Sequence, residues 1–182
     1  MAHHHDKNRY ALAVGHIAIE WNFLERDLQC LALNYLNLDA DTVTHMFAFM
    51  GNVSRADFTA YLADRYEEDL SLKDHIHHFI HMFHRLRANR NIVEHGVPAL
   101  TRDGTFLGEI IKLDRRQGDM PYAAPQEEVD KFLQEIAATR RYVIAIREIV
   151  EGDKKDLLSK LKKPEMPARM HATAQRVDSG RD

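Results

Sequence analysis

The stretch from Arg90 to Gly96, which reads Arg-Asn-Ile-Val-Glu-His-Gly, combines residue types that could cleave a phosphodiester bond. Such cleavage needs a group that moves a proton near neutral pH and a fixed cation that stabilises the charged transition state. Histidine, with an ordinary pKa of about 6.5, suits the first task, and the permanently charged fork of arginine suits the second. Arg90 and His95 are therefore the candidate catalytic pair.

The residues alone also fit a structural interpretation, and taken by themselves they favour it. Arg90 and His95 would then be surface residues at a helix end, where His95 offsets the negative end of the helix dipole. A looser version of the spacing occurs at Arg9 and His16, so chance can produce it in a chain with 12 histidines. The tighter form, Arg-Asn-x-x-x-His-Gly at the end of a long helix, occurs once.

Apolar residues recur at steps of three and four along most of the chain, which predicts helices. The expected helices are a long one over about residues 7–37, a short one capped by Asp39 or Asp41, a third from Ser54 to about Glu67, a fourth from Ser71 to Gly96, and a last one after Pro125. Gly96 suits the left-handed position after a helix, and Pro98 cannot continue one. The fourth helix would thus present the candidate pair at its end.

The period changes between the fourth and the last helix. Residues from about 99 to 113 predict a small β-hairpin that turns at Asp103-Gly104, and residues 117–119 predict a loop. The predicted architecture is all-α: an antiparallel bundle of four to five helices over residues 7–152, with the hairpin inserted before the last helix. Residues 153–182 are lysine-rich at first and poor in apolar residues, which predicts a flexible tail.

The composition is that of an ordinary globular protein. Hydrophobic residues make up 45% of the 182 positions and charged residues 29%. A net charge of −3 argues against an extensive basic groove for nucleic acid, but it leaves room for a local phosphate site that includes Arg85 and Arg87. The chain has no signal peptide and no apolar run of membrane length, so the expected location is cytoplasmic, without a membrane partner.

A row of histidines shares one side of the fourth helix with His95. His77, His81 and His84 lie within about 60° of one another on an ideal helix, opposite the apolar side chains, and have the spacing of a helical metal site. No cysteine accompanies them, and a carboxylate would have to come from another segment. A solvated face or a subunit interface is the favoured interpretation, with a metal site as the alternative, and neither a metal nor another cofactor is expected.

The helix geometry also bears on assembly. Arg90 and His95 are five residues apart, which separates them by about 140° around an ideal helix. One straight helix cannot aim both at one phosphate without long side chains, a distorted helix end or a second copy of the site. A two-fold dimer that brings two such helix ends together would solve this problem, so a homodimer is predicted.

Taken together, these features resemble the HEPN superfamily (higher eukaryotes and prokaryotes nucleotide-binding). The resemblance rests on Arg90-Asn91-x-x-x-His95 at the end of a long helix, and on the first-helix segment Glu20-Trp21-Asn22-Phe23-Leu24-Glu25. It covers about residues 7–150. It implies a dimeric helical bundle and a metal-independent RNA endonuclease, in which the arginine and histidine of both protomers meet at a cleft.

The resemblance also implies a role for each residue of the stretch. Arg90 would bind the scissile phosphate, His95 would move the proton of the 2′-hydroxyl or of the leaving oxygen, and Asn91 would orient either partner. Cleavage through the 2′-hydroxyl would leave a cyclic phosphate and spare DNA. Arg85 and Arg87 are the predicted substrate-binding residues.

The resemblance therefore implies two alternative functions. One is a ribonuclease, of the toxin or defence kind, whose partners would be RNA and a neutralising antitoxin. The alternative is a non-catalytic nucleotide-binding, RNA-binding or dimerisation module, since such members of the superfamily exist.

Overall fold

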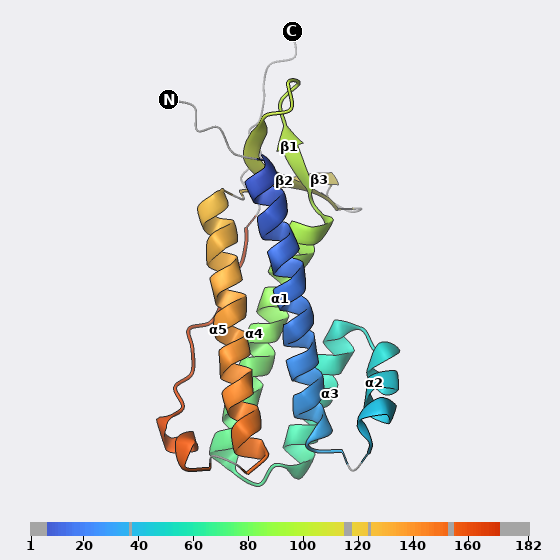
Figure 1. Ribbon diagram of the computed structural model, residues 1–182, viewed down its shortest axis with the longest axis vertical. Helices are drawn as coiled ribbons and strands as arrows, with labels where there is room; N and C mark the ends of the chain where they lie inside the picture. Colours follow the sequence, from blue (N-terminus) through green and yellow to red (C-terminus); the bar gives the residue numbers. More distant parts are fainter. Residues whose placement is uncertain (1–6, 37, 115–117, 124, 153–154, 172–182) are drawn as a thin grey trace.

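The computed structural model describes residues 7–36, 38–114, 118–123, 125–152 and 155–171. Three long helices form the body of the molecule, two shorter helices lie beside it, and a small sheet lies at one end (Figure 1). The elements are α1 (Lys7–Leu33), α2 (Ala40–Ala48), α3 (Asn52–Tyr66), α4 (Leu70–His95), β1 (Val97–Leu100), β2 (Phe106–Asp114), β3 (Gly118–Ala123), α5 (Gln126–Val150) and the 3₁₀ helix η1 (Lys155–Lys160). None of the helices within these residues is both long and apolar enough to span a membrane.

Large apolar side chains fill the space between α1, α4 and α5. Ile17, Trp21 and Leu24 of α1 are completely buried, as the apolar stripe predicts. The rings of Trp21 and Phe83 lie 4.9 Å apart, which joins the middle of α1 to the middle of α4. Burying a side chain of this size contributes roughly 2–3 kcal/mol, so this contact fixes α4 firmly against α1.

Ion pairs connect α1 to α5. The guanidinium of Arg140 lies 2.6 Å from Glu20 and 3.3 Å from Asp27. Arg147, two turns further along α5, lies 3.2 Å from the same Asp27. Because both arginines contact one carboxylate, these contacts fix how α5 lies along α1.

The starts of α3 and α4 differ from their predicted positions. α3 begins at Asn52 rather than at Ser54. α4 begins at Leu70, because the carboxylate of Asp69 accepts hydrogen bonds from the backbone N–H groups of Ser71 and Leu72 at 2.8 and 3.1 Å. Asp69 is therefore the cap, whereas the helix was predicted to start at Ser71. α1 ends at Leu33, four residues before the predicted end.

The sheet contains one strand more than the predicted hairpin. β1 and β2 pair antiparallel, and the connection turns at Gly104, whose φ is +86°, as the Asp-Gly sequence predicts. β3 then pairs antiparallel with β2 along its whole length. It includes Gly118 and Asp119, which were expected in a loop; Gln117 lies outside the described residues. Pro121 is tolerated because β3 is an edge strand.

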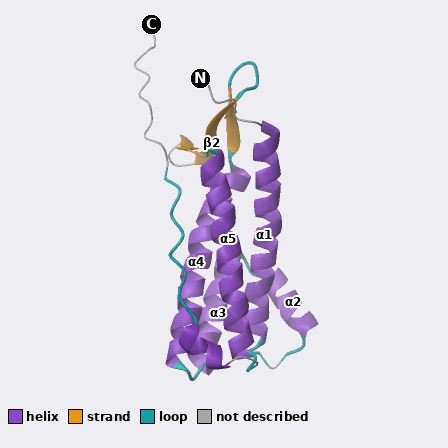
Figure 2. Ribbon diagram, turned by 60° about the vertical axis from the view of Figure 1, so that its left-hand side comes forward, coloured by secondary structure: helices purple, strands orange, loops and turns teal. Residues whose placement is uncertain are grey.

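The segment after α5 was expected to be a flexible tail, but residues 155–171 lie against the bundle (Figure 2). Leu157, Leu158 and Leu161 pack against the main core. The imidazole Nε2 of His78 lies 2.9 Å from the backbone oxygen of Pro164. The expectation of a flexible tail is thus corrected for residues 155–171, and residues 172–182 are outside the described chain.

Candidate functional site

The end of α4 is determined by packing at Gly96. The N–H of Gly96 still donates to the carbonyl of Ile92 at 2.9 Å, and the chain then continues directly into β1. The φ of Gly96 is −83°, so the prediction that Gly96 adopts the left-handed conformation is wrong. A Cβ at this position would lie 1.9 Å from Cγ2 of Ile110. Glycine is needed here because a strand passes close by.

His95 is the last residue of α4 and is exposed to solvent. Within the described part of the chain, no side chain or backbone group forms a hydrogen bond or an ion pair with its imidazole. Asn91, one turn earlier, is half-buried. An exposed, unpaired imidazole is free to exchange protons with a bound molecule.

Arg90 points the other way, toward α1. Its guanidinium carbon lies 5.9 Å from the centre of the Trp21 ring, within the range of a cation–π contact. It forms an ion pair with Glu94 of the same helix and lies 3.5 Å from Oδ1 of Asn91. Its Nε is buried without a hydrogen-bond partner among the described residues. Arg90 is therefore held in place, but a carboxylate partly neutralises its charge.

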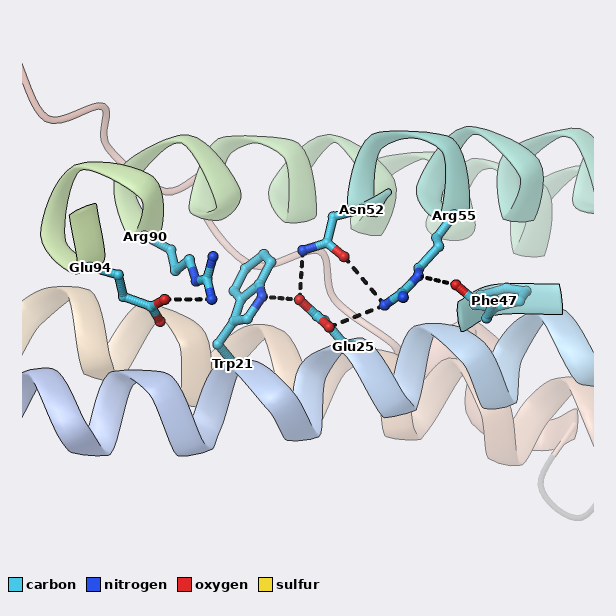
Figure 3. A network of polar contacts seen from close by, with 7 residues as sticks. All are labelled: Trp21, Glu25, Phe47, Asn52, Arg55, Arg90 and Glu94. Atoms are coloured by element: carbon cyan, nitrogen blue, oxygen red, sulfur yellow. Dashed lines mark hydrogen bonds and ion pairs between the residues drawn. The ribbon is translucent and has the colours of Figure 1, made fainter. Parts of the chain in front are cut away.

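A chain of polar contacts extends from the indole of Trp21 toward α3 (Figure 3). The indole N–H of Trp21 donates to Glu25, whose carboxylate also accepts from Asn52 at 2.6 Å and from Arg55 at 3.2 Å. Arg55 in turn donates to the backbone oxygen of Phe47 at 2.9 Å. This network ties α1 to α3 and to the end of α2, and it fixes the tryptophan against which Arg90 lies.

Within one chain the structure leaves Arg90 and His95 on different sides of α4. Arg90 faces α1, whereas His95 is exposed, in agreement with the angle of about 140° between two residues five positions apart. Both lie near the sheet end of the bundle, whereas α2 and α3 cover only the opposite part of its length (Figure 1). A single chain therefore does not assemble the expected pair.

Arg85 and Arg87, the predicted substrate-binding residues, are both half-buried. They line one pocket of about 390 Å³ between α4 and the segment that follows η1. Arg169 lies in the same pocket, and so do His81 and His84. The structure thus brings the two predicted residues together and adds a third arginine to them.

The histidine row is less free than predicted. Nε2 of His77 lies 2.8 Å from Asp64, and Nε2 of His84 lies 3.0 Å from Asp57, both aspartates belonging to α3. Only His81 of the three is exposed. The face that was expected to be solvated is therefore partly covered by α3. No group of three or more histidine, cysteine, aspartate or glutamate side chains in the described segments is placed to hold a metal ion.

Sequence reasoning missed three residues of this region: Trp21, Glu94 and Arg169. Glu94 could have been found, because an arginine and a glutamate four residues apart on a helix pair readily. Trp21 was noted as part of the first-helix segment that carries the family resemblance, but not as a partner of Arg90, because no local pattern links the two residues. Arg169 was missed because its segment was expected to be a flexible tail.

The chain matches no family model, and comparison with curated proteins and with solved structures gives no match either.

Proposed function

We propose that this protein is a metal-independent RNA endonuclease of the HEPN type, with its reactive groups at the end of α4. The observation that carries the proposal is the state of the two key residues. His95 is exposed and unpaired at the last position of the helix, while Arg90, five residues earlier, is fixed on a buried tryptophan. An exposed proton carrier and a fixed cation are the two groups that cleavage through a 2′-hydroxyl requires.

Each residue has a defined task in this proposal. The imidazole of His95 takes the proton of the 2′-hydroxyl, or gives a proton to the departing 5′-oxygen. As the 2′-oxygen attacks phosphorus and the bond to the 5′-oxygen breaks, Arg90 stabilises the additional negative charge on the phosphate. Asn91 is half-buried beside Arg90 and would orient either partner. The products are a 2′,3′-cyclic phosphate and a free 5′-hydroxyl.

The proposed active unit is a homodimer. Because Arg90 and His95 of one chain face different directions, a phosphate that contacts both needs groups from two copies. The sheet end of the bundle is the place where two such copies would meet, since α2 and α3 do not extend to it (Figure 1). If the protein is a toxin, a neutralising antitoxin is a further partner.

One observation favours a second function, that of a non-catalytic RNA-binding or dimerisation module. The ion pair between Arg90 and Glu94 already satisfies much of the charge of Arg90. An arginine in such a pair often has a structural role at a helix end. The two functions differ in one respect: a binding module retains RNA without forming a product.

Incubation with end-labelled single-stranded RNA in EDTA separates the two. The ribonuclease proposal predicts cleavage in EDTA, no cleavage of single-stranded DNA of the same sequence, and products that carry a 2′,3′-cyclic phosphate. RNA that is bound but stays intact at every protein concentration would identify the binding module.

A further inference from the structure

The pocket between α4 and residues 164–170 has an unusual charge distribution. Three arginines and two histidines line it: Arg85, Arg87, Arg169, His81 and His84. No carboxylate is among its lining residues. The nearby carboxylate of Asp57 is already paired with His84 at 3.0 Å. The pocket therefore concentrates positive charge in a protein whose net charge is −3.

Two arginines of this pocket differ from the other half-buried arginines of the described residues. Every other half-buried arginine in the described residues pairs with a carboxylate, namely Arg55, Arg90, Arg140 and Arg147. Arg85 and Arg87 are half-buried without such a partner in the same residues, and Nε of Arg87 is buried without any hydrogen bond. Removing a guanidinium from water without a partner is unfavourable, and a bound anion would supply the missing acceptors.

The backbone around the third arginine, Arg169, is held in place by Asn89 of α4. The buried amide of Asn89 donates to the carbonyl of Ala168 at 2.7 Å and accepts from the N–H of Met170 at 3.0 Å. These two residues are the neighbours of Arg169 on either side. Asn89 thus fixes the backbone on both sides of Arg169, which gives the pocket a wall with a defined position.

The pocket lies on the same side of α4 as His95. Residues 81, 84, 88, 91 and 95 follow one another at steps of three and four, so they share one face of the helix. Ala88, which lines the pocket, is seven residues before His95, about 10.5 Å along the helix axis. A stacked strand rises about 3.4 Å per nucleotide, so this distance corresponds to about three nucleotides.

We infer that this pocket binds a backbone phosphate of the RNA strand, about three nucleotides from the bond that is cleaved. Arg85, Arg87 and Arg169 are its phosphate ligands. This inference rests on the proposed function, because it assumes that RNA is the substrate. It assigns a binding role to the segment after η1, which supplies Arg169.

The test measures the affinity of the protein for a fluorescein-labelled single-stranded DNA, which has no 2′-hydroxyl and stays intact. The affinity for the RNA of the same sequence is measured in the His95→Ala protein. Arg169→Ala and Arg85→Ala are compared with Arg141→Ala. Arg141 is an exposed arginine of α5, so its removal changes the net charge equally. Circular dichroism verifies that each variant is folded; Arg169 is exposed and outside the core, so its variant keeps the fold.

Both pocket variants should bind about tenfold more weakly, as expected when a charge-assisted contact to phosphate is lost. The slope of log affinity against log salt should also fall in magnitude by about 0.7, the value for one phosphate contact of a single strand. Arg141→Ala should change neither quantity appreciably. Pocket variants that bind with the parent's affinity and salt slope would overturn the inference, and so would a parent that binds neither strand.

The binding test of the pocket and the cleavage test of the proposed ribonuclease can fail independently of each other. Weaker binding by the pocket variants, in a protein that never cleaves RNA, supports the pocket and rejects the nuclease. Cleavage by the parent together with unchanged binding by the pocket variants rejects the pocket alone.

Discussion

Arg90 is the residue at which the structural and the catalytic interpretations of this protein meet. Its guanidinium lies over Trp21 and pairs with Glu94, whose side chain is largely buried. A phosphate that approaches Arg90 must compete with this carboxylate or share the arginine with it. The same ion pair therefore positions the cation and weakens its attraction for an anion.

This competition predicts the effect of Glu94→Gln. Glutamine keeps the shape of the side chain and removes its charge, so Arg90 becomes more available to phosphate, and RNA should bind and be cleaved several-fold better. Fluorescence anisotropy and a cleavage assay measure the two effects. Glu68→Gln is the control, because it removes the same charge from an exposed loop residue. Weaker binding and cleavage by a folded Glu94→Gln protein would show that Glu94 assists the site.

His75 provides a second prediction at this scale, on stability and pH. It is buried, and its Nδ1 lies 2.6 Å from the hydroxyl of Tyr142. Burial lowers the pKa of His75, and the positive charge of Lys163 lowers it further. As the pH falls through about 6.5, the unfolded chain therefore takes up a proton that the folded protein does not, so the stability falls with decreasing pH.

Urea unfolding between about pH 7 and pH 5.5 measures this dependence. The free energy of unfolding of the parent should decrease over this range. It should decrease less in His75→Gln, whose side-chain amide can still form a hydrogen bond with Tyr142 but does not titrate. His45→Gln, at an exposed position of α2, is the control and should behave like the parent. An equally steep loss in His75→Gln would assign the dependence to other groups.

At the scale of elements, the junction between α4 and β1 positions His95. The chain leaves the helix at Gly96, whose N–H still bonds to Ile92, and enters a strand that lies against the fully buried Ile110. No room remains there for a side chain. The position of the imidazole thus depends on a close contact between the helix end and β2.

Gly96→Ala should consequently destabilise the protein. The φ of −83° is acceptable for alanine, but its Cβ would lie 1.9 Å from Ile110 and 2.6 Å from the carbonyl of Ile92. Overpacking of this kind costs about 1–3 kcal/mol, which urea unfolding can measure. Gly15→Ala is the control: nothing lies within 4 Å of its Cβ, and alanine inside a helix should stabilise by about 0.5–1 kcal/mol. An unchanged Gly96→Ala protein would contradict the role given to this contact.

The elements that the sequence predicts well are those with local signals. The apolar stripe of α1, the Asp-Gly turn and the end of α4 next to Gly96 depend on neighbouring residues, and the structure contains all three. β3 and residues 155–171 depend on partners far along the chain. The glycine and proline of β3 look like loop residues until β2 pairs with them. The polar segment after η1 is fixed by Asn89, which no local pattern links to it.

In the candidate site too, the features with local sequence signals are predicted and those that depend on distant residues are not. The residue types of Arg90, Asn91 and His95 and their positions on α4 follow from the sequence. The direction of Arg90 does not, because Trp21, on another helix, determines it. The pocket that includes Arg85 and Arg87 could not be predicted either, since one of its walls comes from the segment after η1.

At the scale of the whole molecule, the proposal requires a dimer with the two α4 ends close together. Light scattering should give about twice the chain mass of 21.1 kDa at micromolar concentration. In a His95→Cys variant, a short thiol cross-linker should join the two chains efficiently, whereas His45→Cys, on α2 at the other end of the bundle, should react far less. A strict monomer would contradict the assembly, as would a dimer in which only the His45→Cys variant is joined.

Cleavage of single-stranded RNA by the His95→Ala protein in EDTA tests the central claim most directly. His95 is exposed, so its replacement should leave the fold and the dimer intact, as circular dichroism and light scattering can verify. The matched control is His16→Ala, an exposed histidine from the looser Arg9–His16 pattern. Since a general acid or base contributes about 10²–10⁴ in rate, the account predicts at least a hundredfold loss for His95→Ala and none for His16→Ala. A folded His95→Ala protein that cleaves RNA as fast as the parent would contradict it.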